Sequence, residues 1–344
     1  MSVLLAPKAE PQWKACVTFM RNFIPFNDIT AKKFLLATDF SAASAAAFRA
    51  SLSLCAQFGA SLYVLHVVDN ASCSRPESGG LLIDSDSFYG DAAVSVRALI
   101  DEARRAGVAC EGTLVTGWPH DSILDVLNSQ SCDLVVLGTR AIRGFEHLVF
   151  GSTAEAVIRN ARRPVLTLGP QASSQPPHNN PSAGIALFAT DFHVVTTEAI
   201  RYAALFAKTM NLPLHCLHVL PRGIEGDVSR PRISSLITDA LKHLVAGLDL
   251  GPLLPVCAVT YGSEISNTVV GYARSHHARL IVLGARRASL AASHVPAHIV
   301  YRIITEAPCP VLMMAFPIEP KMSPFHLSEA RQPQGLCHAW RSND

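Results

Sequence analysis

The chain has 344 residues, of which 49% are hydrophobic and 16% are charged, and its formal net charge is +2. This composition excludes a disordered chain, and it argues against a nucleic-acid partner, whose binding needs a concentrated excess of Lys and Arg. The length suits two domains of about 150 residues each. No apolar stretch approaches the roughly 18 residues of a membrane-spanning helix, and no secretory signal is visible, so we expect a cytoplasmic protein without a membrane partner.

The nine cysteines are odd in number and include no Cys-x-x-Cys pair. Because a cytosolic protein keeps its thiols reduced, we expect buried free thiols at the four positions within apolar periodic segments. These positions are Cys55, Cys132, Cys216 and Cys309. Cys73 lies in a polar loop and is the candidate for a redox role.

Four short segments occur twice in the same order, which indicates two copies of one domain. Ala37-Thr38-Asp39-Phe40 returns at 189–192, Leu65-His66-Val67 at 217–219, Val136-Leu137-Gly138 at 282–284, and Pro164-Val165-Leu166 at 310–312. The predicted divisions are an N-terminal extension (1–31), domain 1 (32–170), a Pro-rich linker (171–183), domain 2 (184–316) and a C-terminal tail (317–344).

Strands and helices alternate along the first copy. In chain order we expect a strand over 34–38, a helix over 42–58, a strand over 62–68, a loop over 69–90, a helix over 92–106 and a strand over 110–115. A helix over 121–128, a strand over 134–137, a helix framed by 151–161 and a strand over 165–168 follow. The apolar runs are nearly continuous, as is typical of a parallel sheet covered on both faces.

The second copy repeats this order, with strands expected over 185–190, 214–220, 256–260, 280–283 and 311–314. The sequence therefore predicts an α/β protein with two tandem doubly wound, mostly parallel five-stranded sheets and helices on both faces. Ligands of such sheets bind beyond the carboxyl ends of the strands.

The segment after the fourth strand has the parts of a phosphate-binding site. Gly138 ends the strand, and Gly151-Ser152-Thr153 begins the next helix. Glycines allow a ligand to approach the backbone, and a helix start offers N–H donors with a partial positive charge. Arg140 and Arg143 add positive charge between the two.

With these residues the chain resembles the universal stress protein family, the UspA-like proteins, as a tandem member. The family's nucleotide-binding branch carries Gly, two residues, Gly, nine residues, then Gly-Ser/Thr. Gly138 and Gly151-Ser152 match this pattern, while Ala141 stands at the middle glycine. The resemblance covers nearly the whole chain except the tails and the linker.

The resemblance implies a Rossmann-like fold of the adenine nucleotide alpha hydrolase type. It also implies that ATP or another adenine nucleotide binds in domain 1, with or without Mg²⁺. Asp39 and Val67 would hold the adenosine part, and Ala37 and Thr38 would line the same pocket. The candidate binding residues are Ala37, Thr38, Asp39, Val67, Gly138, Thr139, Arg140, Ala141, Gly151, Ser152 and Thr153.

The two copies differ from the family pattern to different degrees. The methyl group of Ala141 is the smallest possible change, so we expect weakened binding in domain 1. Domain 2 has Arg287 at the middle glycine and Ala297-His298 at the closing pair, after Pro296, which lacks an N–H donor. Although Asp191 and Val219 are retained, we expect domain 2 not to bind ATP in the family's manner.

Several candidate residues also have a purely structural interpretation. Ser152 and Glu155 fit a capping box, and Asp39 could cap the next helix, as Ser41 also could. His66 and His218 lie inside predicted strands and are expected to be hydrogen-bonded core residues. The remaining pairs, His276-His277 and Arg162-Arg163, are expected at solvated helix ends.

The leading functional hypothesis is a stress-response regulator that binds a nucleotide and recruits an unknown protein partner. One alternative is a nucleotide-independent UspA-like interaction protein. Another is a slow ATPase, although no Walker-type lysine, nucleophile elbow, general base or metal-ligand cluster is present, so no catalytic or metal-binding residue is assigned. By the resemblance, strands 165–168 and 311–314 pair as an intramolecular pseudo-dimer. A homo-oligomer remains an open alternative.

Overall fold

The computed structural model describes residues 29, 31–69, 85–139, 141–142, 149–173, 184–192, 199–222, 230–286 and 296–316. Most of the predicted extension and all of the predicted tail lie outside these residues, as do Cys73, Arg140, Arg143 and Arg287.

The first half of the chain alternates strands and helices as predicted. Its elements are β1 (Lys33–Thr38), α2 (Ala42–Phe58), β2 (Ser61–Asp69), α4 (Ser85–Arg105), β3 (Cys110–Gly117), α5 (Pro119–Ser129), β4 (Leu134–Gly138), β5 (Ala141–Ile142), β6 (Val149–Phe150), α6 (Ser152–Asn160), β7 (Val165–Leu168) and α7 (Pro170–Ser173). The predicted bounds of α2 are confirmed. Gly59 ends this helix in the left-handed conformation (φ 61°), and its N–H donates to the Cys55 carbonyl.

The second half repeats the pattern. Its elements are β8 (Ile185–Ala189), α9 (Ala199–Thr209), β9 (Leu214–Pro221), α10 (Arg230–Val245), β10 (Val256–Gly262), α11 (Ile265–Ser275), β11 (Ala278–Arg286), α13 (Pro296–Glu306) and β12 (Val311–Phe316). All five predicted strands are present, and several extend beyond their predicted ends. None of the described helices is both long and apolar enough to cross a membrane.

Three local features differ from the sequence prediction. Helix α4 begins at Ser85 within the predicted loop, where its polar composition hides the helical period and Tyr89 hydrogen-bonds Thr116 of β3. Strands β5 and β6 have two residues each, too few to show a period. Helix α7 begins at Pro170, where proline suits a first helical position, and its other residues lie in the predicted linker (171–183).

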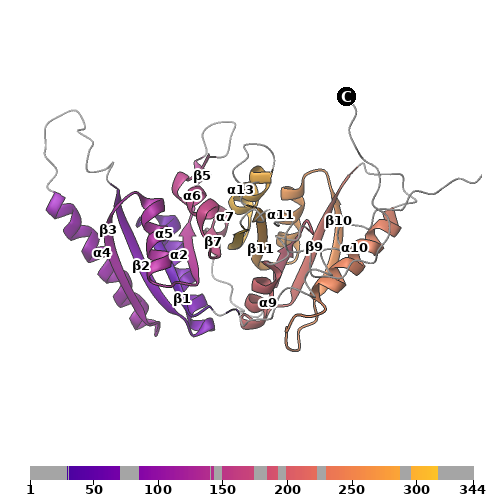
Figure 1. The fold of residues 1–344 in the computed structure, drawn as a ribbon, viewed down its shortest axis with the longest axis horizontal. Helices are drawn as coiled ribbons and strands as arrows, with labels where there is room; N and C mark the ends of the chain where they lie inside the picture. The colour runs from indigo at the N-terminus through magenta and orange to yellow at the C-terminus, as the bar shows by residue number, and fades with distance from the viewer. Residues whose placement is uncertain are drawn as a thin grey trace, which may run out of the picture.

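The ten strands of the main sheet lie in the order β10-β9-β8-β11-β12-β7-β4-β1-β2-β3 (Figure 1). Neighbouring strands are parallel within each half, whereas β7 and β12 pair in the antiparallel sense. The order within each half is that of a doubly wound sheet, so the predicted fold class is confirmed. The predicted pairing of the two last strands is confirmed as well, and it joins the two sheets into one.

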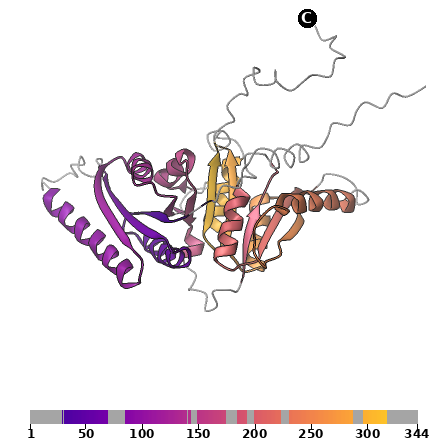
Figure 2. The same cartoon turned by 60° about the horizontal axis from the view of Figure 1, so that its bottom comes forward.

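Alternate residues of each strand face opposite sides of the sheet, and each side has its own core. In β1, Phe34 and Leu36 lie in the core under α2, α4, α9 and α10, whereas Leu35 lies in the core under α5, α6, α11 and α13. Figure 2 shows helices on both sides of the sheet. Each core contains buried residues from both halves, so neither half is packed independently of the other.

Contacts join the two halves along the whole junction. Leu166 of β7 lies opposite Leu312 of β12. On one side of the sheet, the Phe58 ring of α2 lies 4.7 Å from the Phe206 ring of α9. On the other side, α6 of the first half contacts β12 of the second. The junction therefore combines strand pairing with apolar packing on both faces.

Candidate functional site

The predicted site lies at the carboxyl edge of the first half of the sheet. Strands β1 and β4 are neighbours there, with Ala37 opposite Leu137, and β2 continues from β1 on the other side. The order of the strands reverses between β1 and β4, and doubly wound sheets bind ligands at such a point. Of the predicted residues, the structure places Thr38, Asp39 and Gly138 at the ends of these two strands.

The turn after β1 is fixed by its own side chains. The Thr38 hydroxyl is buried, accepts from the Phe40 N–H at 3.1 Å and donates to the Ser44 hydroxyl at 3.1 Å. The Asp39 carboxylate accepts from the Ser41 N–H at 3.0 Å while its side chain stays exposed. The N-cap of α2 is thus Ser41 and not Asp39, whose exposed carboxylate instead closes a turn onto Ser41.

Phe40 is a residue that sequence reasoning left without a role, although its repetition after Asp39 and Asp191 was visible. It adopts a left-handed conformation (φ 58°), which is unusual for a bulky residue, and its ring lies 4.4 Å from that of His66. His66 Nδ1 lies 2.8 Å from the Thr38 carbonyl oxygen, as expected for a hydrogen-bonded core histidine.

The second half repeats this arrangement after β8. Phe192 has a φ of 60°, and its ring lies 5.0 Å from that of His218, whose Nδ1 lies 2.8 Å from the Thr190 carbonyl oxygen. Burial lowers the pKa of His218, which keeps the imidazole neutral at pH 7. Because both halves share the arrangement, it does not distinguish a nucleotide site from a structural turn.

The end of β4 is shaped by the protein's own packing. A Cβ on Gly138 would lie 2.3 Å from the Ala43 carbonyl carbon and 2.6 Å from the Ser44 nitrogen, both in the first turn of α2. The Thr139 N–H and hydroxyl both donate to the Leu168 carbonyl, at 2.9 and 3.3 Å. Gly138 is therefore required by the approach of a helix, and Thr139 is bound to β7.

The two ends of the segment between Gly138 and Gly151 pair with each other. Ala141 of β5 pairs with Phe150 of β6 in an antiparallel hairpin, which brings Ala141 beside the residue that precedes Gly151. The structure thus brings together the middle and closing positions of the pattern. Arg140 lies outside the described residues.

Helix α6 begins at this point, and its start differs from the predicted capping box. Gly151 is the N-cap residue and has no side chain to accept from the first N–H groups, while Ser152 is the first helical residue and is exposed. Glu155 instead forms an ion pair with Arg159. In contrast, the start of α2 is capped, because the Ser41 hydroxyl accepts from the Ser44 N–H at 3.3 Å.

The corresponding helix of the second half starts differently. Helix α13 begins with Pro296, which brings no N–H group to the helix start, and the Ala297-His298 pair follows in its first turn. Of the two equivalent helix starts, that of α6 therefore offers more backbone donors to an anion.

Cysteine chemistry and metal binding find no support among the described residues. Cys55, Cys132, Cys216 and Cys309 are free and buried, as expected. Burial raises the pKa of the Cys55 thiol to about 12 and that of Cys132 to about 11, which makes both poor nucleophiles. No group of three His, Cys, Asp or Glu side chains there could hold a metal ion. The sequence predicts a solvated helix end at His276. Instead, its ring stacks on that of Tyr272, with the two ring centroids 3.9 Å apart, so it is not fully solvated.

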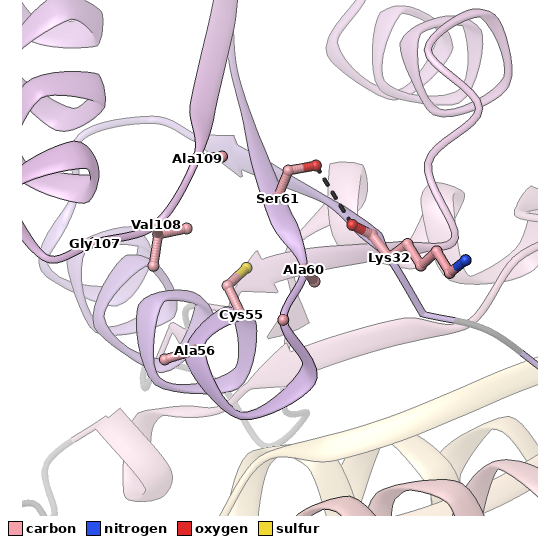
Figure 3. Close-up of a pocket in the computed structure, with 9 residues that line it drawn as sticks. Lys32, Cys55, Ala56, Ala60, Ser61, Gly107, Val108 and Ala109 are labelled. Carbon is pink, nitrogen blue, oxygen red and sulfur yellow. Dashed lines mark hydrogen bonds between the residues drawn. The ribbon is translucent and has the colours of Figure 1, made fainter.

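A hollow of about 440 Å³ lies at the opposite edge of the sheet, near the amino ends of β1, β2 and β3 (Figure 3). Lys32, Cys55 and Ser61 lie on its wall among small apolar residues, and the Ser61 hydroxyl donates to the Lys32 carbonyl at 3.4 Å. Its polar side chains are few and its thiol is unreactive, so the carboxyl edge remains the candidate site.

Comparison with known proteins identifies the family. The model of the universal stress protein family matches residues 30–168 and 184–315. The chain belongs to this family. The two matched regions show that it is a tandem member with two universal stress protein domains, the N-terminal and C-terminal domains.

Individual relatives cover one domain each, whereas a solved structure covers both. A universal stress protein of Methanocaldococcus jannaschii is 29% identical over 138 residues, which is 40% of this chain and 81% of the relative. The protein YxiE of Bacillus subtilis is 28% identical over 142 residues, 39% of this chain and 96% of its own length. The crystal structure of a universal stress protein from Archaeoglobus fulgidus has a TM-score of 0.61 at 19% identity and covers 83% of this chain and 98% of its own. This last likeness concerns the fold.

Proposed function

We propose that this universal stress protein binds an adenine nucleotide in its N-terminal domain and acts as a stress-response regulator. In this proposal Asp39 and Val67 hold the adenosine part, and the start of α6 receives the phosphates. Signalling comes from the bound state, through recruitment of a protein partner, and needs no chemical step.

The observation that supports this proposal most strongly is the glycine at the start of α6. Gly151 has φ −59° and ψ 130°, a conformation open to any residue, and no described atom lies within 4 Å of the place a Cβ would occupy. Neither backbone strain nor packing against the described residues therefore requires a glycine there. A glycine at this N-cap leaves room for the close approach of a ligand, and the N–H groups of Ser152 and Thr153 are suited to a phosphate.

The C-terminal domain has a different role in this proposal. Its pattern contains Arg287 and Ala297-His298 in place of the glycines and the serine, and α13 begins with a proline. We propose that it binds no ATP and provides a fixed surface next to the sensing domain.

One alternative function has an observation in its favour. Ala141 adds a methyl group at the position where the family's nucleotide-binding pattern has glycine. It lies in the hairpin beside Phe150. If this methyl group occupies the space of the phosphates, the protein is a nucleotide-independent interaction protein. Ala141→Gly would then create binding that the wild-type chain lacks.

Calorimetric titration of the full chain with ATP, AMP and adenosine tests the proposal. We expect one site per chain and tighter binding of ATP than of adenosine. In Gly151→Val, the affinity for ATP should fall at least tenfold, because the branched side chain fills the space beside the helix start. Its melting temperature should fall by only a few degrees, because the observed backbone conformation suits valine although valine is a poorer N-cap than glycine.

The matched control is Ala297→Val, at the equivalent position of the C-terminal domain, which should leave the affinity for ATP unchanged. Absence of heat with every nucleotide, together with none extracted from the purified protein, would contradict the proposal. Loss of binding in the control but not in Gly151→Val would show that the nucleotide binds in the C-terminal domain, which would also contradict the proposal.

A further inference from the structure

Helix α6 connects the candidate phosphate site with the other domain. Its first residues form the proposed site, and Arg159 in its last turn donates from Nε to the Tyr301 hydroxyl of α13 at 3.3 Å. Arg159 also forms an ion pair with Glu155, one turn closer to the site. Glu155, Arg159 and Tyr301 thus form a continuous polar chain from the first turn of α6 to the C-terminal domain.

This polar chain lies in a partly enclosed place. The side chains of Glu155 and Arg159 are 31% and 34% exposed, and Tyr301 is half-buried. Burial raises the pKa of Tyr301, Arg159 opposes the shift, and Glu155, which also hydrogen-bonds the hydroxyl, adds to it, so the hydroxyl keeps its proton. Partial burial weakens the screening of these charges by salt, so each of them still interacts with a charge one helical turn away.

The charge of Glu155 acts against an anion at the start of α6. Without a ligand, a carboxylate in the first turn stabilises a helix. The same carboxylate repels a phosphate that binds the free N–H groups of that turn. Arg159 offsets this repulsion by pairing with the carboxylate. Tyr301 holds the guanidinium of Arg159 in place, which reduces the rotamer freedom that the arginine would otherwise keep.

We propose that Arg159 and Tyr301 are positioning residues that couple phosphate binding in the N-terminal domain to the C-terminal domain. Neither contacts the nucleotide; they act on it through Glu155. The coupling rests on the proposed function. Because coupling between two equilibria is reciprocal, a bound phosphate also strengthens the contact between Arg159 and Tyr301, and this is how the C-terminal domain would sense occupancy.

The arrangement is not repeated in the opposite direction. When the two helix starts are aligned, Tyr301 itself corresponds to Glu155, and Thr305 corresponds to Arg159. The Thr305 hydroxyl donates to the Tyr301 carbonyl at 2.9 Å within its own helix. The C-terminal domain therefore contributes a neutral acceptor to the polar chain, while both of its charges come from the N-terminal domain.

The test uses the full chain and compares ATP with adenosine by calorimetry. In Arg159→Gln we expect the affinity for ATP to fall about five- to tenfold, because the charge of Glu155 in the first turn of α6 is no longer offset by a guanidinium. In Tyr301→Phe we expect a fall of about two- to threefold. Adenosine, which has no phosphate, should bind both variants as it binds the wild type, whereas general damage to the fold would weaken both ligands.

A rescue variant and a control complete the test. Adding Glu155→Gln to Arg159→Gln should restore most of the lost affinity for ATP, because the negative charge in the first turn of α6 is then removed. Arg302→Gln is the control, since Arg302 lies on the same helix α13 and pairs with Glu306 at 3.0 Å and Glu264 at 2.7 Å, within its own domain. It should leave ATP binding unchanged.

The outcomes separate the coupling from the proposed function. If the wild-type chain binds ATP but Arg159→Gln and Tyr301→Phe bind it equally well, the coupling is wrong while the nucleotide site stands. Failure of Glu155→Gln to rescue, or an equal loss for adenosine, likewise overturns the coupling. If the wild-type chain binds no nucleotide at all, the proposed function fails and the coupling fails with it.

Discussion

Two glycines of the candidate site have different physical reasons to be glycine. At Gly138, a side chain would collide with the backbone of Ala43 and Ser44 in helix α2. At Gly151, no described atom stands within 4 Å of a Cβ, and the backbone conformation is ordinary. The first glycine therefore serves the packing of the domain, whereas neither the described neighbours nor backbone strain requires the second, which stands at the N-cap of α6.

Alanine substitutions separate these two roles. Gly138→Ala should lower the free energy of unfolding by about 2 kcal/mol, because α2 must move to admit the methyl group. Gly151→Ala should lower it by less than about 1 kcal/mol, because alanine is a poorer N-cap than glycine while the methyl group meets no described atom. Urea denaturation measures both values. Equal destabilisation by the two substitutions would show that Gly151 is also a packing residue.

Two histidines of the C-terminal domain make its stability depend on pH. Burial is the main cause that lowers the pKa of His215 and of His218, and the nearby His276 lowers that of His215 further. The unfolded chain, whose histidines titrate near pH 6.5, then binds protons more readily than the folded chain. This stability is fully present above about pH 6.5 and is lost as the pH falls through the lowered folded-state values.

We therefore expect the free energy of unfolding to be smaller at about pH 5 than at about pH 7.5. The decrease should be smaller in His215→Phe, which removes one of the two titrating groups. Urea denaturation at the two pH values gives the comparison. A wild-type chain that is equally stable at both would contradict the assigned directions.

At the scale of elements, the junction depends on a close approach between a strand end and a helix. A Cβ on Gly169, directly after β7, would lie 2.0 Å from the Ile304 carbonyl oxygen of α13. Thr167 of β7 donates its hydroxyl to the Val311 carbonyl of β12 at 3.1 Å. Strand β7 is thus fixed to the C-terminal domain both along its edge and at its end.

Gly169→Ala should destabilise the protein by about 2 kcal/mol, because the collision is with backbone that cannot rotate away. Gly271→Ala offers the contrasting change, since Gly271 lies inside α11 with no described atom within 4 Å of a Cβ. There alanine should raise the stability by about 0.5–1 kcal/mol through its better helix propensity. Thermal and urea unfolding of both variants test this pair, and a neutral Gly169→Ala would contradict the described junction.

Elements with a strong local signal could be predicted from the sequence, and those set by tertiary contacts could not. Helix α2 was predictable in full because an Ala-rich helical stretch ends at Gly59. The early start of α4 was missed because its first turns are polar and its anchor, the contact of Tyr89 with Thr116, is remote in sequence.

The same distinction between local signals and tertiary contacts applies to the candidate site. The glycine pattern and the polar turn that contains Asp39 could be recognised in the sequence as short motifs. That Gly138 faces α2, that Thr139 is bound to Leu168 and that Arg159 reaches Tyr301 depend on elements which only the fold brings together. The position of Ser152 in the first turn, instead of at the N-cap, depends on a difference of one residue in a helix boundary, which sequence patterns do not resolve.

At the scale of the whole molecule, the two domains share one sheet and two cores. Separating them would expose the backbone edges of β7 and β12 together with the apolar surface around Phe58 and Phe206. Exposed strand edges favour pairing with another strand. The linker therefore keeps the domains in one chain, but the junction itself provides the association.

Residues 1–170 and 184–344, expressed together as separate chains, should purify as a stable one-to-one complex. The pairing of β7 with β12 and the shared cores are present without the covalent link. Size-exclusion chromatography with light scattering measures the complex. Recovery of two independent monomers would contradict the shared core, whereas each half paired with a second copy of itself would show that the junction does not select its partner.

In the proposed site, the start of α6 holds the phosphates of an adenine nucleotide. A crystal structure of the full chain grown with ATP and Mg²⁺ tests it most directly. We predict phosphate oxygens within hydrogen-bond distance of the backbone nitrogens of Ser152 and Thr153, with the C-terminal domain empty. A nucleotide bound at the start of α13 instead, or side chains filling the space beside Gly151 at saturating ATP, would contradict the account.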